Sequence, residues 1–285
     1  HYTNKVKEFA KATHQPKYYY FAWANRLITY YLKTSRTNIA LYEVQNMLKE
    51  AQEEDDKTGL SRCYNIMSQI YTIKRFDSMA FEWRLKEIEL TEKYKIENYN
   101  ISQTYAQIAN YYINQKKQKE ALAAVEKAIA TANSSTQQIS AKLEFVNYYS
   151  KFGDFQAAEK LLKECQAAFE QDKRLESIKK RLYNIECLYY QQTKQYPKAL
   201  EAAKMQEKEE RRLSESILSS SHYRTQGEIY QKMGNMNLAV KYLQMYINTD
   251  DSLKIANEQV ASSEFATLLN VEKLNAEKKE LMLQA

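Results

Sequence analysis

The residues that most often carry catalysis or hold metals are scarce in this chain and lie far apart. The three histidines are His1, His14 and His222, and no two of them have the spacing of a metal-binding motif. Neither HExxH nor GxSxG occurs, and four glycines cannot build a glycine-rich phosphate loop. The carboxylates lie in mixed-charge runs, which are typical of a solvated helix surface. The sequence therefore predicts no enzymatic activity, no cofactor and no metal site.

The three cysteines, Cys63, Cys165 and Cys187, show no CxxC spacing. An odd number without that spacing disfavours both a disulfide framework and a zinc site. The chain contains a repeated helix-pair pattern, and Cys165 and Cys187 fall at positions of this pattern that face each other on neighbouring helices. Two small buried thiols are the favoured interpretation, and a bridge between them is the alternative.

The charge pattern disfavours nucleic acid as a partner of this segment. A net charge of +6 arises from 42 basic and 36 acidic residues that are mixed along the chain, whereas a nucleic-acid surface needs clustering on one side. No run of apolar residues is long enough to span a membrane, and no signal peptide is visible. Because the chain begins with His1 rather than methionine, we expect an excised or processed fragment.

The elements that position the polar side chains are predicted to be paired helices. Six times, an aromatic-rich segment is followed by an alanine-centred segment, and the unit returns after roughly 40 residues. Only four glycines and two prolines interrupt the pattern, which favours long helices and an all-α solenoid. Gly153 and Gly234 are expected to end helices in the left-handed conformation. Polar segments at 133–136, at Asp172 and at 249–252 are expected to separate helices.

These residues resemble the tetratricopeptide repeat, a helix pair with bulky, small and aromatic residues at set positions. The resemblance covers about residues 21 to 250 and implies a right-handed α-solenoid of about six pairs, with a period longer than the usual ~34 residues. In the last unit the matching residues are Tyr223, Gly227, Tyr230, Gly234, Ala239, Leu243 and Tyr246. The alanines that begin the second helices are Ala40, Ala80, Ala121, Ala158, Ala199 and Ala239.

The resemblance also implies where a ligand would bind. In this family the first helix of each pair lines a concave face that takes an extended peptide or protein segment. Projected onto this chain, those positions hold Asn25, Arg26, Asn65, Gln69, Asn110, Asn147, Lys151, Asn184, Gln191, Arg224 and Gln231. Amides can donate to and accept from a peptide backbone, and cations can hold a carboxylate. The alternative is a polar helix face that binds nothing.

The last segment, 251–285, is expected to cap the array and continue as a signalling helix. It contains neither glycine nor proline, and a heptad seam runs through Thr267, Val271, Leu274, Lys278, Leu281 and Ala285. Such a seam would allow a homodimer through this helix, and the alternative is a helix that frays beyond the array. The predicted organisation is an N-terminal helix at 1–16, the array at 17–250 and this tail.

The run from Ser263 to Leu274 with the charged Glu277–Glu280 is similar to the juncture in membrane-anchored bacterial sensors. There, an extracytoplasmic repeat array continues into a transmembrane helix, followed by a histidine kinase or a transcriptional regulator. The resemblance implies a periplasmic, membrane-tethered sensor domain in which a transmembrane helix follows the fragment. The alternatives are a soluble adaptor for protein partners and a cytoplasmic peptide-pheromone receptor.

Overall fold

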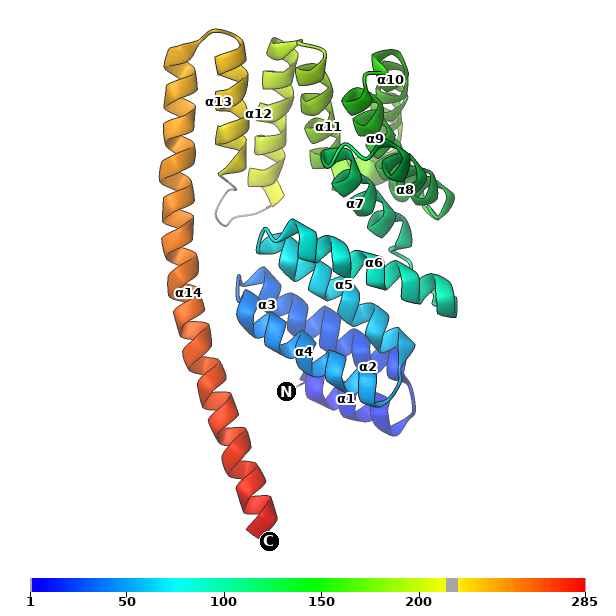
Figure 1. The fold of residues 1–285 in the computed structure, drawn as a ribbon, viewed down its shortest axis with the longest axis vertical. Coiled ribbons are helices and arrows are strands. Elements are labelled where there is room, and N and C mark those ends of the chain that lie inside the picture. The colour runs from blue at the N-terminus through cyan, green and yellow to red at the C-terminus, as the bar shows by residue number, and fades with distance from the viewer. Residues whose placement is uncertain (1, 214–219, 285) are drawn as a thin grey trace. The chain divides into compact units, whose positions relative to one another are not determined.

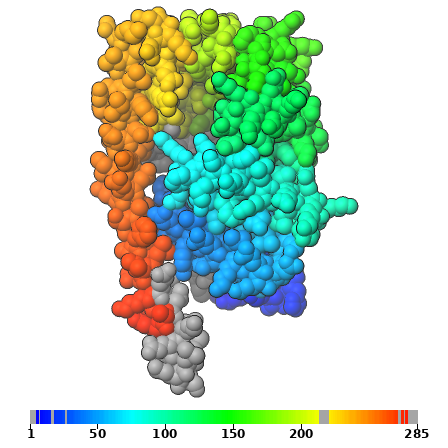
Figure 2. Space-filling view, viewed as in Figure 1, coloured from blue at the N-terminus to red at the C-terminus, as the bar shows by residue number. Residues whose placement is uncertain are grey.

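The computed structural model describes residues 2–213 and 220–284, and every regular element in those ranges is helical (Figure 1). The all-α fold expected from the sequence is confirmed. The chain forms two compact units, one of His1–Glu97 with Lys254–Ala285 and one of Asn98–Leu253. In the space-filling view, residues before 98 are blue to cyan and residues from 98 to about 250 run from green to orange (Figure 2).

The first unit begins with α1 (Tyr2–Ala12) and a long helix made of α2 (Pro16–Ala22), the π-helical η1 (Trp23–Ile28) and α3 (Thr29–Lys33). This composite helix packs on α4 (Thr37–Glu53), and α5 (Lys57–Ile73) packs on α6 (Asp77–Tyr94). Tyr20 is fully buried against Gly59, where a Cβ would lie 2.5 Å from the tyrosine ring. The close approach of α5 to this ring therefore requires glycine.

The second unit contains α7 (Ile101–Asn114), α8 (Gln118–Ala130), α9 (Ser135–Phe152) and α10 (Phe155–Gln171), followed by the 3-10 helix η2 (Lys173–Ile178). It continues with α11 (Lys179–Gln192), α12 (Tyr196–Leu213), α13 (Ser221–Lys232) and the first part of α14 (Met236–Gln284). Successive helices pack as antiparallel pairs, and the first helices α7, α9 and α11 lie side by side. The predicted helix pairs are thus present in both units.

Every helix pair turns through one residue with a positive φ. The predicted left-handed glycines are confirmed, with φ of 91° at Gly153 and 78° at Gly234. The other four turns use a residue with a side chain in this conformation, namely Ser35, Arg75, Lys116 and Lys194. A Cβ makes the left-handed conformation unfavourable, so the turn geometry is imposed by packing of the helices on either side.

Two predicted helix boundaries are wrong. Residues 249–252 do not separate helices, because α14 runs unbroken from Met236 to Gln284. Their polar groups find other partners: Ser252 Oγ donates to the Asn248 carbonyl at 2.8 Å, and Asp250 accepts from Ser220 at 2.8 Å. Asn133 and Ser134 do precede a new helix, as expected. The second wrong boundary is the end of the N-terminal helix, which was predicted at residue 16. This helix ends at Ala12, and Pro16 begins the next helix, α2.

The cysteines are all free and buried, in agreement with the favoured interpretation. Burial raises the pKa of the Cys165 and Cys187 thiols to about 11, so both stay protonated near neutral pH. Of the proposed heptad seam, Leu274 is exposed, and the side chains of Val271, Lys278 and Leu281 lie outside the described set. Within the described ranges, no helix combines the length and apolarity needed to cross a bilayer.

Replacing Lys116 by glycine is predicted to stabilise the folded chain. Lys116 has a φ of 57°, so Lys116→Gly should raise the free energy of unfolding by about 0.5–1 kcal/mol because it removes the Cβ strain. Lys117, the next residue, has a φ of −87°, so Lys117→Gly should lower stability. Urea denaturation followed by circular dichroism measures both, and equal effects of the two substitutions would contradict the argument.

Candidate functional site

The first helices of the second unit share one face, here called the first-helix face, which is formed by α7, α9 and α11. A cavity of about 130 Å³ opens on it, lined by Ser102, Gln103, Ala106, Thr136, Gln137, Ser140, Ala141, Ile178 and Arg181. All three helices contribute to this lining. The cavity is therefore a product of stacking and is present in no single repeat.

The polar groups on one side of the cavity come from the beginning of α9. Ser134 caps this helix by accepting from the Gln137 backbone N–H at 3.3 Å. The Gln137 side chain donates to the Tyr99 carbonyl at 2.7 Å and thus ties α9 to the segment before α7. Unpaired N–H groups and the helix dipole give this end a partial positive charge. A carbonyl or carboxylate oxygen would be favoured there.

Opposite this helix end lies an ion pair that joins α9 to α11. The Arg181 guanidinium donates to Glu144, whose side chain is only 5% exposed. Asn147 also donates to this carboxylate, at 3.3 Å. The Nε of Arg181 is buried and has no hydrogen-bond partner among the described residues. A buried donor without a partner is costly, and the same side chain is part of the cavity lining.

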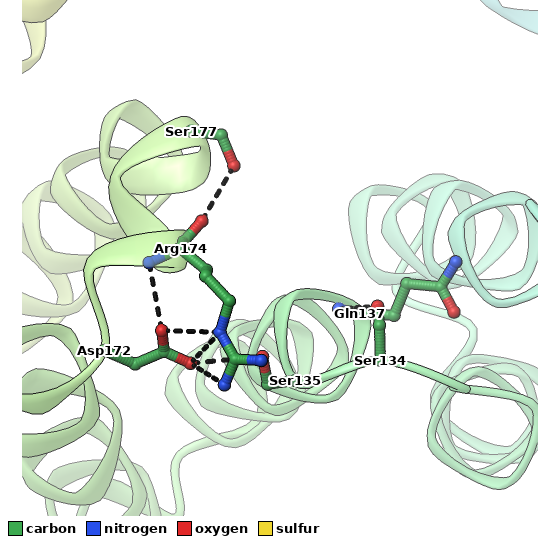
Figure 3. A network of polar contacts seen from close by, with 6 residues as sticks. All are labelled: Ser134, Ser135, Gln137, Asp172, Arg174 and Ser177. Atoms are coloured by element: carbon green, nitrogen blue, oxygen red, sulfur yellow. Dashed lines mark hydrogen bonds and ion pairs between the residues drawn. The ribbon is translucent and has the colours of Figure 1, made fainter.

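A second ionic network joins the start of η2 to the start of α9 (Figure 3). Asp172 accepts from the Arg174 backbone N–H at 3.0 Å, from its guanidinium at 2.8 Å and from Ser135 Oγ at 3.2 Å. Hydrogen bonds from the Arg174 side chain and backbone lower the pKa of the Asp172 carboxyl to about 2. The beginning of η2 is thereby tied to the beginning of α9.

The predicted binding residues of the second unit differ in how far they can reach a ligand. Lys151 on α9, Asn184 on α11, and Arg224 and Gln231 on α13 are exposed, although Arg224 also pairs with Glu228 at 2.8 Å. Asn147 is 7% exposed and holds Glu144. The two remaining residues are half-buried: Asn110 accepts from Asn114 at 3.1 Å, and Gln191 accepts from Lys232 at 3.4 Å.

The predicted residues of the first unit also differ in how far they can reach a ligand. Asn25 and Gln69 are exposed, and the side chain of Arg26 lies outside the described set. Asn65 donates to both carboxylate oxygens of Glu87, at 3.1 and 3.2 Å, and accepts from Gln69 at 2.7 Å. Glu87 is 1% exposed. Asn65 thus holds a buried carboxylate, as Asn147 does in the second unit.

The sequence pattern did not single out Glu144, Arg181 or the hydroxyls of the cavity as functional residues. One signal was available. Glu144 and Arg181 are 37 residues apart, and so are Ser135 and Asp172. Such a separation is about one repeat, so each pair occupies equivalent positions of neighbouring units and can meet across the stack.

A buried histidine lies where α12 meets α13. His222 is 5% exposed, and neither of its ring nitrogens has a hydrogen-bond partner among the described residues. Its Nε2 lies 3.8 Å from Glu207, which also binds Arg211 at 2.7 Å and Gln226 at 2.7 Å. Burial lowers the pKa of His222 more than the nearby carboxylates raise it. Within the described ranges, no group of histidines, cysteines and carboxylates could hold a metal.

Comparison with known proteins shows a likeness of fold. No protein-family model and no curated protein matches the sequence. Among solved structures, NprR in complex with its cognate peptide NprX has a TM-score of 0.63 at 14% identity, covering 88% of this chain and 70% of NprR. Rap protein complexed with competence and sporulation factor has a TM-score of 0.56 at 17% identity, covering 95% and 82%.

A tetratricopeptide repeat protein from Parabacteroides merdae has a TM-score of 0.56 at 13% identity, covering 92% of this chain and 91% of that protein. The helix pairs therefore have the tetratricopeptide-repeat fold that the sequence resembles. At these identities the likeness describes the architecture, and the binding chemistry has to be argued from the side chains of this chain.

The ion pair on the first-helix face predicts strong coupling between its partners. Arg181→Met should lower the free energy of unfolding by about 2–3 kcal/mol because it leaves Glu144 charged and buried. Adding Glu144→Gln should restore most of this loss. Lys180→Met, which removes a more exposed pair with Glu210, should cost under about 1 kcal/mol. Additive effects of the Arg181 and Glu144 changes in urea denaturation would exclude a coupled pair.

His222 predicts a loss of stability in mild acid. Its pKa is lowered in the folded chain, so the unfolded chain binds a proton first as pH falls. The free energy of unfolding is thus highest above the ordinary pKa of about 6.5 and declines below it, by at most about 1.4 kcal/mol per pH unit. His222→Gln should flatten this decline between about pH 7 and 5. An unchanged slope would show that other groups cause it.

Proposed function

We propose that this chain is a non-enzymatic domain that binds an extended peptide or protein segment on the first-helix face. The observation that carries the proposal is the cavity between α7, α9 and α11, which is lined by the start of α9 and by the Arg181 cation. Both favour an acceptor oxygen. The fold likeness to NprR, solved with its cognate peptide NprX, supports a peptide or protein as the ligand class.

The exposed residues indicate which chemical groups a ligand should carry. Lys151 and Asn184 stand on the helices that line the cavity. An amide can pair with the backbone of an extended chain, and an ammonium favours a carboxylate. A ligand with a carboxylate, from a side chain or a chain end, placed near Lys151 fits this surface best.

We further propose that the domain is the periplasmic sensor of a membrane-anchored bacterial signalling protein. Helix α14 continues as one helix well beyond its pairing with α13, which is the kind of connection such a sensor needs. Ligand binding would change the placement or pairing of the tail, provided that the ligand binds two arrangements with different affinity. A cytoplasmic peptide receptor is the second candidate, favoured by the fold likeness to NprR and Rap.

Peptide arrays test the binding proposal. The chain is applied to unstructured peptides that carry either free or amidated carboxyl ends. Lys151→Ala should weaken binding about tenfold, as expected for a lost hydrogen bond to a charged group, and Asn184→Ala should weaken it less. Lys160→Ala, exposed on the second helix α10, is the matched control. Equal losses in Lys151→Ala and Lys160→Ala would place binding elsewhere.

The sequence of the full-length gene tests the membrane proposal. We expect an apolar segment of about 20 residues shortly after Ala285, followed by a kinase or DNA-binding domain. A DNA-binding domain before His1 with no such apolar segment would instead favour the cytoplasmic receptor.

A further inference from the structure

The residue at the N-cap of helix α4 does not cap the helix with its own side chain. Arg36 occupies that position and makes no capping hydrogen bond. The cap comes from α14: Glu264 Oε1 accepts from the backbone N–H groups of Asn38 at 3.1 Å and Ile39 at 3.2 Å. Its Oε2 accepts from the Asn38 side chain at 2.8 Å. A carboxylate more than 200 residues away thus performs the role that a local Ser or Asp usually has.

The groups around Glu264 stabilise a negative charge. Glu264 is only 3% exposed, and a carboxylate removed from water is costly unless donors replace the water. Three N–H groups and the positive end of the α4 dipole do so here. Lys74, which follows the last residue of α5, adds a nearby cation by donating to Asn38 Oδ1 at 2.6 Å.

Glu264 is the most deeply buried group of its segment, where Val260 and Leu268, one turn before and after it, are half-buried. Among residues 251–270, Glu264 is the only buried side chain. Its neighbours Ser263 and Phe265 are exposed, the latter by 61%. A helix held by apolar area would tolerate the loss of one charge, because its contact is spread over many atoms. Here the half-buried apolar residues contribute only part of their area, and Glu264 makes three hydrogen bonds to Asn38 and Ile39. Loss or repulsion of this carboxylate should therefore loosen the tail.

We propose that Glu264 is a releasable latch that holds the tail of α14 against the start of α4. When it is engaged, the tail is docked and α4 is capped. When it is displaced, the tail leaves and the first turn of α4 is open to water. The latch is a two-state device in the first unit, and its test does not rely on the ligand proposed for the second unit.

Spin labels test the latch in the full chain. Gln45 on α4 and Asn270 on α14 are exposed, and the native cysteines are buried, so labels on cysteines at 45 and 270 report the distance between the two helices. The parent protein should give one narrow distance distribution. Glu264→Gln should broaden it, and backbone amide exchange at Asn38 and Ile39 should become about tenfold faster. Glu258→Gln, exposed on the same helix, should leave both measurements unchanged.

A second variant separates release of the tail from damage to α4. Asn38→Asp places a negative charge near the start of α4, where it favours the helix and can pair with Lys74, but it repels Glu264. This variant should unfold at nearly the parent temperature and still show the broadened distances. A narrow distribution retained in both Glu264→Gln and Asn38→Asp would overturn the latch. Equal broadening in Glu258→Gln would also overturn it, because mobility would then not depend on Glu264.

Discussion

The close approach of the two helices in each pair depends on one alanine at the start of the second helix. These six alanines, Ala40, Ala80, Ala121, Ala158, Ala199 and Ala239, are exposed by at most 2%. A larger side chain would separate the helices and open voids that the surrounding aromatics could not fill. The tight turns, including four that place a residue with a Cβ at positive φ, are a consequence of this spacing. Helix packing therefore determines loop strain in this fold.

Stacking of one pair on the next is secured by polar contacts as well as by apolar area. Glu144 with Arg181 and Ser135 with Asp172 join positions 37 residues apart, and Asn38 with Lys74 joins positions 36 apart. Each pair spans about one repeat. On the first-helix face, Arg181 both joins two helix pairs and lines the cavity.

A recurrent theme is a buried carboxylate held by an asparagine. Asn65 holds Glu87, Asn147 holds Glu144, and Asn38 holds Glu264. An amide satisfies a carboxylate without adding a positive charge, so further donors decide how firmly each site is held. Glu144 also receives Arg181 from the next helix pair. Glu264 is bound by backbone N–H groups of one helix and comes from another, which makes this contact separable.

Repeat length, pairing of helices, buried alanines and the glycine turns were determined by the sequence alone, because they follow from local periodicity and backbone preference. Only the tertiary structure decided the partners of the polar side chains. Asn147 looked like a ligand-binding amide in sequence, yet stacking places it on Glu144, while Lys151 one turn later stays exposed. Contacts such as Asn38 with Glu264, 226 residues apart, have no sequence signal, since they depend on how far α14 continues and where it meets α4. The sequence also listed the polar residues of the first helices, and the fold decided which of them are exposed.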